Sequence, residues 1–295
     1  MIRVGTAGWS FPDWEGIVYP KGASTRPLAL QTLARMFDTV EINVTFYRPP
    51  TPRMAGGWVT RVASHPSFTF AAKLWRGFTH ERDERHDEEE RAFREGLGPL
   101  MEASRLGALL AQFPQSFVDN PANRRYLRSL IGRFGDYPLV VELRHASWLE
   151  GDALEMLGET GTGFCNIDQP LIGKAVPPTT VVTGRIGYVR LHGRNAADWF
   201  RRDAGRDRRY DYLYSHEEIK DWVERVRLMQ KKGKGDADIF IIANNHYRGQ
   251  APANAIEIVH ALTGRRVEAP ESLLEAFPRL KQITTISERT GRLPL

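Results

Sequence analysis

The chain has 295 residues, 41% of them hydrophobic and 26% charged, and a formal net charge of +5 from 41 basic and 36 acidic residues. This is an ordinary globular composition with enough residues for a sizeable core, and the single cysteine, Cys165, excludes internal disulfides and cysteine-based zinc clusters. No apolar run reaches the ~18–20 residues of a membrane span, and the N-terminus lacks the layout of a signal peptide, so we expect a cytoplasmic protein without membrane contacts.

Eight short segments along the chain have the pattern of β-strands. Most are continuous apolar runs, the form that parallel strands take when both of their faces are buried. In chain order they are residues 2–7, 39–43, 69–73, 108–112, 139–143, 164–168, 187–191 and 239–243.

Segments with helical periodicity lie between most of these strands. They are residues 28–37, 54–62, 88–104, 122–134, 152–159, 217–231 and 253–262. The sequences "DNPANRR" and "SHEEIKDW" have the capping residue and the first-turn proline or acid that are typical of helix starts. The connection 169–185 is the exception, because "AVPPTTVVTG" disfavours a helix, so we expect this one to be short or missing.

This alternation predicts an α/β fold, a TIM-like (β/α)8 barrel in a single domain over residues 1–263. The alternative is a doubly wound open sheet, but "GTAGW" after the first strand is not the Gly-x-Gly-x-x-Gly of a dinucleotide site. Residues 264–295 form a C-terminal tail. In it "PESLLEAFPRL" predicts one more helix that packs on the barrel.

Polar residues close seven of the eight predicted strands, at the end where barrel enzymes carry their active sites. On four strands the ending is a polar–apolar–polar triplet, whose two polar members share a face because successive side chains alternate. The pairs are Glu41 with Asn43, Glu142 with Arg144, Asn166 with Asp168, and Arg190 with His192. We expect all four pairs on the inner face of the barrel, together with Lys73, Gln112, Asn244 and Asn245.

The charges of this predicted mouth balance, with three acids and three bases. The acids are Glu41, Glu142 and Asp168, and the bases are Lys73, Arg144 and Arg190. Buried charges need partners, and such a network perturbs pKa values in the way that acid–base sites do. Either glutamate is suited to proton transfer, and their order as acid and base stays open.

Several motifs in chain order resemble the YecE-like family, known as domain of unknown function 72. They include "GTAGWSFPDWEGIVYP", "FDTVEINVTFYRPP", "VVELRHASW", "YVRLHG" and "ANNHYRGQAPANA", and the resemblance runs from residue 2 to about residue 263. It implies a TIM-like barrel in a bacterial or archaeal protein and brings no reaction. It also points to Trp9, Tyr47 and Trp148 as site residues.

The first functional hypothesis is an enzyme that performs metal-independent acid–base chemistry on a small polar anion and needs no cofactor. Arginine and lysine at the mouth suit a phosphate or a carboxylate. Lys73 is also a candidate Schiff-base nucleophile if its pKa is depressed. The expected catalytic residues are Glu41, Lys73, Glu142, Asp168 and His192. The expected substrate-binding residues are Trp9, Asn43, Tyr47, Gln112, Arg144, Trp148, Arg190, Asn244 and Asn245.

Two alternatives stay open. One is a divalent-metal site on Glu142, Asp168 and His192, as in sugar isomerases or endonuclease-type phosphodiesterases, although three cations crowd the mouth. The other is single-stranded nucleic-acid binding by loop 193–214, where six arginines alternate with aromatic residues but four aspartates dilute the charge. That loop is otherwise a lid over the mouth. By strand parity we expect Cys165 between barrel and helices, and the oligomeric state is left open.

Overall fold

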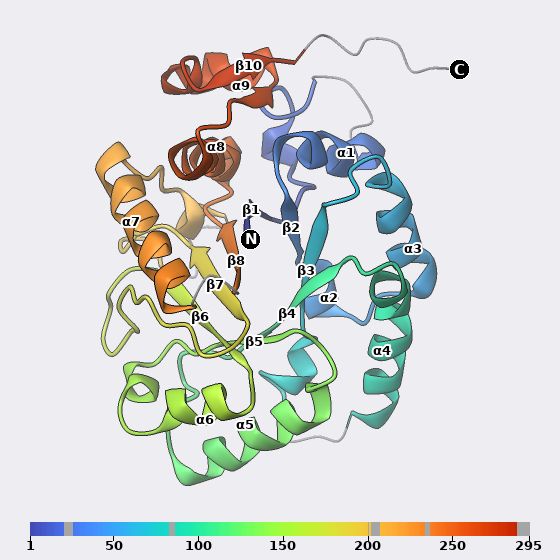
Figure 1. Cartoon of the computed structure of the whole chain (residues 1–295), viewed down its shortest axis with the longest axis vertical. Helices are drawn as coiled ribbons and strands as arrows, with labels where there is room; N and C mark the ends of the chain where they lie inside the picture. Colours follow the sequence, from blue (N-terminus) through green and yellow to red (C-terminus); the bar gives the residue numbers. More distant parts are fainter. Residues whose placement is uncertain (21–25, 83–85, 200, 202–206, 234–236, 288–295) are drawn as a thin grey trace.

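The computed structural model describes residues 1–20, 26–82, 86–199, 201, 207–233 and 237–287. Eight parallel strands form a closed barrel in chain order, with β8 pairing back to β1 (Figure 1). The strands are β1 (Ile2–Ala7), β2 (Thr39–Ile42), β3 (Thr69–Lys73), β4 (Leu106–Gln112), β5 (Leu139–Glu142), β6 (Gly163–Asp168), β7 (Ile186–Leu191) and β8 (Asp238–Ala243). The predicted (β/α)8 barrel is therefore confirmed.

Helices surround the barrel in the expected places (Figure 1). The main ones are α1 (Arg26–Met36), α3 (Pro52–Arg61), α4 (Asp87–Glu102), α5 (Pro121–Phe134), α6 (Ala153–Glu159), α7 (His216–Lys232) and α8 (Gln250–Thr263). Both predicted starts are confirmed: the Asn120 side chain caps α5, and Ser215 forms a capping box with Glu218 at α7. A short helix, α2 (Val44–Tyr47), follows β2 directly and was not predicted.

The sixth connection, residues 169–185, contains no helix. An outward side chain of β6 holds this segment in place instead. The amide of Asn166 donates to the Val181 carbonyl at 2.9 Å and accepts from the Val181 N–H at 2.8 Å, and Thr179 donates to the same oxygen at 2.6 Å. Hydrogen bonds from one buried amide thus fix the segment, and Val176, Val181 and Val182 add apolar contacts with the core.

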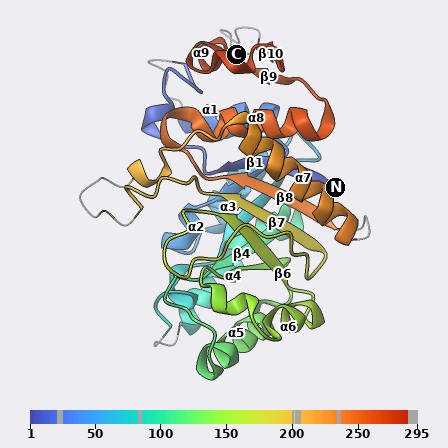
Figure 2. The ribbon, with the colours of Figure 1, turned by 90° about the vertical axis from the view of Figure 1, so that its left-hand side faces the viewer.

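The C-terminal tail packs on α1 and α8 (Figure 2). It contains β9 (Val267–Ala269), the predicted helix as α9 (Glu271–Ala276), a 3-10 turn η6 (Pro278–Leu280) and β10 (Thr284–Ile286). β9 and β10 pair in parallel as a small separate sheet that was not predicted, since three residues are too few to show strand periodicity. Along the described part of the chain, no helix is both long and apolar enough to cross a membrane.

Candidate active site

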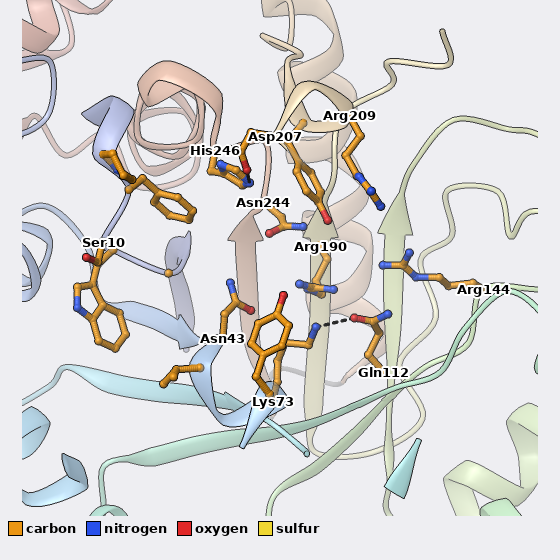
Figure 3. Close-up of a pocket in the computed structure, with 17 residues that line it drawn as sticks. Ser10, Asn43, Lys73, Gln112, Arg144, Arg190, Asp207, Arg209, Asn244 and His246 are labelled. Carbon is orange, nitrogen blue, oxygen red and sulfur yellow. Dashed lines mark hydrogen bonds and ion pairs between the residues drawn. The ribbon is translucent and has the colours of Figure 1, made fainter. Parts of the chain in front are cut away.

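A cavity of about 710 Å³ opens at the carboxyl ends of the strands (Figure 3). Its walls come from the carboxyl ends of seven of the eight strands or the segments that follow them, including the described end of loop 193–214. The lining residues are Gly8, Trp9, Ser10, Phe11, Pro12, Asn43, Val44, Tyr47, Lys73, Gln112, Arg144, Arg190, Asp207, Arg209, Tyr210, Asn244 and His246. The position is the one that a barrel enzyme uses for catalysis.

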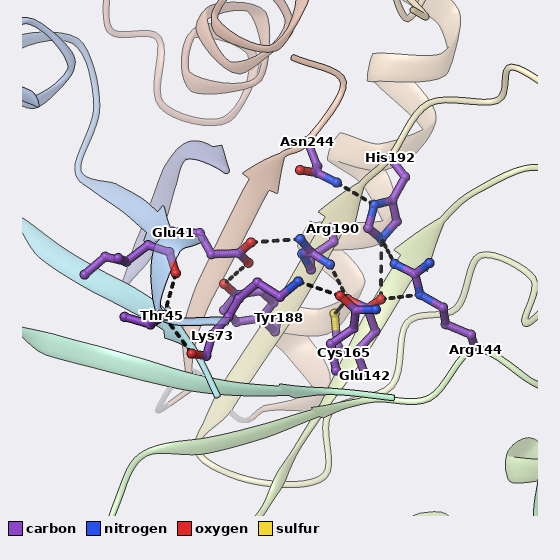
Figure 4. Close-up of polar contacts among 12 residues, drawn as sticks. Glu41, Thr45, Lys73, Glu142, Arg144, Cys165, Tyr188, Arg190, His192 and Asn244 are labelled. Carbon is purple, nitrogen blue, oxygen red and sulfur yellow. Dashed lines mark hydrogen bonds and ion pairs between the residues drawn. The ribbon is translucent and has the colours of Figure 1, made fainter. Parts of the chain in front are cut away.

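Beneath the cavity, one buried arginine joins two buried glutamates (Figure 4). Arg190 on β7 donates from Nη2 to Glu41 Oε1 at 2.8 Å and from Nη1 to Glu142 Oε2 at 2.6 Å. The hydroxyl of Tyr188 donates to the other oxygen of Glu41 at 2.9 Å. All four of these side chains are at most 2% exposed, so the ion pairs lie out of water, where an unpaired charge is costly.

Arg144 and His192 continue this network toward the mouth. Arg144 donates from Nε to Glu142 Oε1 at 2.6 Å, and its Nη2 lies 3.3 Å from His192 Nε2. The other ring nitrogen of His192 lies 2.8 Å from the Asn244 amide nitrogen. Burial, and then the charge of Arg190, lower the pKa of His192 to about 3, so its imidazole is neutral at neutral pH.

The two glutamates hold arginines and do not face the cavity. Burial by itself would raise the pKa of Glu142, but Arg190 and Arg144 hold it well below its usual range. Each carboxylate oxygen of Glu41 and Glu142 accepts a hydrogen bond from the network. Neither glutamate is among the described residues that line the cavity. Both glutamates thus orient arginine side chains and have no oxygen directed at the cavity.

Lys73, at the end of β3, is the amine of this site. Its Nζ donates to Gln112 Oε1 at 2.6 Å and lies 4.1 Å from the centre of the Phe46 ring. The residue is 8% exposed, and within the described ranges no carboxylate lies within ion-pair distance of it. Burial and then the charge of Arg190 lower the pKa of Lys73 to about 7, although Glu41 and Glu142 raise it in part. Its charge therefore changes close to neutral pH.

Aromatic side chains form the opposite end of the cavity. Phe11 stacks on His246 with ring centres 4.3 Å apart, and Tyr210 lies 4.7 Å from the same imidazole. Trp9 also lines the cavity, whereas Tyr47 lies next to Phe46, the ring that Lys73 contacts. In Figure 3, Ser10 and Arg144 lie on opposite sides, with Lys73 and Asn43 between them. The cavity therefore has one cationic end and one aromatic end.

The predicted inward position of Asn166 and Asp168 is wrong. In the register of β6 with β7, Cys165 is paired with Tyr188 and Ile167 with Arg190, which places these side chains inside the barrel. The Asp168 carboxylate lies outside, where it accepts hydrogen bonds from Arg194 at 2.8 Å and from Trp222 Nε1 at 2.5 Å. Partners on the helical side of the barrel satisfy this carboxylate, so it lies outside the mouth.

Three further placements differ from the prediction. Trp148 lies in the 3-10 turn η3 (Ala146–Leu149), fully buried, where it stacks on Phe117 and donates to the Phe117 carbonyl at 2.6 Å, so it is not a cavity wall. Asn245 points to the Tyr212 carbonyl and the Asn254 amide, behind β8. Cys165 lies inside the barrel, its sulfur 4.0 Å from Glu142 Oε2.

The proposed metal ligands do not converge. Glu142 and His192 lie 3.6 Å apart at their nearest atoms, but Asp168 points out of the barrel toward α7. Throughout the described ranges, no group of three histidine, cysteine or acidic side chains is placed to hold a metal ion. The alternative of a divalent-metal site on these three ligands is therefore wrong.

Nine lining residues were not predicted as site residues: Gly8, Ser10, Phe11, Pro12, Val44, Asp207, Arg209, Tyr210 and His246. A signal was available for some of them. His246 directly follows the two asparagines after β8, and Phe11 follows Trp9 after β1. Residues just past a barrel strand belong to the mouth by topology, whatever their residue type. For Asp207, Arg209 and Tyr210 the signal was their position in loop 193–214, one reading of which was a lid over the mouth, but the pattern does not show which loop residues reach the cavity.

A family model described as "Protein of unknown function DUF72" matches residues 3–279. The chain belongs to the DUF72 family. A curated relative, UPF0759 protein YunF of Bacillus subtilis, is 32% identical over 276 residues, which cover 89% of this chain and 95% of YunF. UPF0759 protein YecE of Escherichia coli is 32% identical over 148 residues, 49% of each chain. The resemblance to the YecE-like family is thereby confirmed.

Solved DUF72 structures have the same barrel. A DUF72 family protein of Thermotoga maritima aligns with a TM-score of 0.77 at 35% identity and covers 89% of this chain and 99% of its own. One from Enterococcus faecalis aligns with a TM-score of 0.76 at 29% identity, over 89% and 95% of the two chains. Membership in DUF72 brings the fold and no reaction, so the function is argued from the cavity.

Proposed function

We propose that this DUF72 protein is an enzyme that binds a small anionic substrate in the barrel mouth and uses Lys73 as its proton-exchanging group, without a metal ion. One observation carries the proposal. The Lys73 amine lies nearly buried at the cavity wall and has no carboxylate partner among the described residues. The two nearby glutamates, Glu41 and Glu142, form ion pairs with Arg190 instead. A pKa of about 7 suits a group that gains and loses a proton at neutral pH.

The charge distribution supports an anionic substrate. Lys73, Arg144, Arg190 and Arg209 line the cavity, against the single described acid Asp207. The glutamates that balance Arg190 and Arg144 lie behind them. A phosphate or carboxylate in the cavity therefore meets positive charge directly, and Arg144 is 19% exposed and available to donate to it.

The aromatic end supports a substrate with a second, flat or apolar part. Phe11 and His246 present stacked rings, and Trp9 adds an indole. A volume of about 710 Å³ falls within the roughly 300–1,000 Å³ of small-molecule sites and exceeds what a bare anion fills. The cavity therefore suits a molecule with an anionic group at one end and a ring or short carbon skeleton at the other.

The anion site is tested with inorganic sulfate, whose charge is constant around neutral pH. We expect isothermal titration calorimetry to detect sulfate binding that Arg144→Met weakens tenfold or more, since a hydrogen bond to a charged group contributes about 1.5–3 kcal/mol. The matched control is Arg227→Met, because Arg227 is exposed on α7. Equal affinity in the two variants would contradict the proposed site.

The role of Lys73 is tested by the pH dependence of the same binding. Above pH about 7 the amine loses its charge, so sulfate affinity is expected to fall as the pH rises from 6 to 8.5. Lys73→Met removes the titrating group and flattens this dependence. A wild-type affinity that is independent of pH over this range would show that Lys73 does not titrate in the anion site.

A further inference from the structure

Lys73 differs from the arginines around it in what its nitrogen contacts. Arg190 is bound by two glutamates and Arg144 by one, so both have a carboxylate counter-ion. The Lys73 amine contacts one neutral amide oxygen, that of Gln112, and one aromatic ring, that of Phe46. The Gln112 oxygen accepts a hydrogen bond from either form of the amine, and the Phe46 ring favours the ammonium form. Neither partner is a counter-ion, however, and a buried amine without a counter-ion favours its neutral form.

The backbone of Lys73 is fixed, so the amine has a defined position. The Thr45 hydroxyl contacts both the Ile42 carbonyl at 2.9 Å and the Lys73 carbonyl at 2.7 Å, which ties the end of β3 to β2. Gln112 then takes one of the N–H groups at the other end of the side chain. A neutral amine has two N–H groups and one lone pair, so the contact with Gln112 leaves the lone pair unused at the cavity wall.

Positive neighbours keep the amine reactive. The charges of Arg190 and Arg144 act on Lys73 and disfavour the ammonium form. Desolvation and an adjacent cation each lower the pKa of a lysine amine, and both effects activate lysine as a nucleophile. The same arginines draw an anion into the cavity, so the structure combines an anion site with an uncharged amine beside it.

We infer that Lys73 is a covalent catalytic residue that forms an imine with an aldehyde or ketone group of the anionic substrate. This inference rests on the proposed function, because the anion site is what brings the carbonyl group to Nζ. The substrate class is thereby narrowed to small carbonyl compounds that carry a carboxylate or a phosphate.

The chemical step balances without a further reactant. The nitrogen lone pair attacks the carbonyl carbon and forms a carbinolamine. The C–O bond then breaks, the oxygen leaves as water with the two hydrogens of the amine, and a C=N bond remains. Protonation of this imine by solvent water withdraws electrons from the adjacent carbon, so a C–H bond there can release its proton to water while its electron pair forms the C=C bond of an enamine. A proton from water then returns to that carbon. Addition of water reverses the sequence and releases the product and the amine.

The test traps the imine by reduction. Purified protein is incubated with glyoxylate, pyruvate or glycolaldehyde phosphate and sodium cyanoborohydride, which delivers hydride to the imine carbon and leaves a stable secondary amine. Peptide mass spectrometry then locates the label. We expect saturable labelling at Lys73 that sulfate suppresses, at least tenfold faster than at the exposed Lys174 and Lys220 of the same sample. Lys73→Met loses this label, and the control Lys220→Met keeps it.

Each outcome decides a different claim. If sulfate binds but no probe labels Lys73 faster than Lys220, the imine is refuted and the proposed anion site stands. If sulfate does not bind at all, the proposed function itself fails. Labelling of Lys73 that sulfate does not suppress would overturn the link between the amine and the anion site. Should Lys73→Met fail to fold, Lys73→Arg keeps the charge and must equally lose the label.

Discussion

Strands β6 and β7 are neighbours that end in the same pattern and use it in opposite ways. On β7, Arg190 and His192 point inward and belong to the network under the cavity. On β6, Asn166 and Asp168 point outward to the sixth connection and to α7. A polar–apolar–polar ending indicates that the two polar side chains lie on the same face of the strand. The register with the next strand decides which face that is, and here it places the β7 pair inside the barrel and the β6 pair outside.

The largest expected effect comes from the inward side, on Arg190→Met. The substitution leaves Glu41 and part of Glu142 buried without their cation, so the free energy of unfolding should fall by about 3–5 kcal/mol. Urea denaturation measures the change, with Arg227→Met as a control within about 0.5 kcal/mol of wild type. Adding Glu41→Gln to Arg190→Met should restore part of the loss. A drop below 1 kcal/mol in the single variant would show that the network is not held by this arginine.

On the outward side, Asp168→Asn should reduce stability and spare the ligand site. The variant loses the ion pair with Arg194 while the Trp222 contact can persist, so the free energy of unfolding should fall by about 1–3 kcal/mol. Sulfate affinity should stay within twofold of wild type in calorimetry. If Asp168→Asn changed that affinity as strongly as Arg144→Met does, the contrast between the two strands would be broken.

Much of the fold follows from local pattern, because a buried parallel strand is apolar throughout and an amphipathic helix has its own period. All eight barrel strands and the missing sixth helix were predicted. The orientation of β6 was not, because it depends on the pairing of Cys165 with Tyr188 across two strands. Trp148 was misplaced for a similar reason: its partner Phe117 lies 31 residues away, and sequence spacing does not show that contact.

A third effect should appear in the pH dependence of stability. The ordinary pKa of lysine is 10.5 and that of Lys73 in the fold is about 7, so between these values the unfolded chain binds a proton that the folded chain does not. The contribution of Lys73 to the free energy of unfolding therefore becomes more favourable to the fold as the pH rises from about 7 to 10.5. Wild type should gain more stability than Lys73→Met between pH 7 and 9.5 in urea denaturation. If the free energy of unfolding changed with pH in the same way in both proteins, the amine of Lys73 in the fold would have an ordinary pKa.

The smallest effect is expected for Cys165, the inward residue of β6. It is fully buried, and burial raises the pKa of its thiol, so the reactive thiolate is suppressed. A small thiol reagent should label Cys165 only when the barrel unfolds, at a rate that increases in urea. Rapid labelling in native buffer would show that solvent reaches this sulfur in the folded protein, which would contradict its position inside the barrel.

The Asn166 side chain also has a consequence for hydrogen exchange. Its oxygen accepts the amide of Val181, 15 residues further along a connection that has no helix or strand. Exchange of that amide then requires this contact to open, and the acceptor is anchored in a buried barrel strand. By hydrogen exchange, Val181 would thus be grouped with β6 although its backbone is that of a loop.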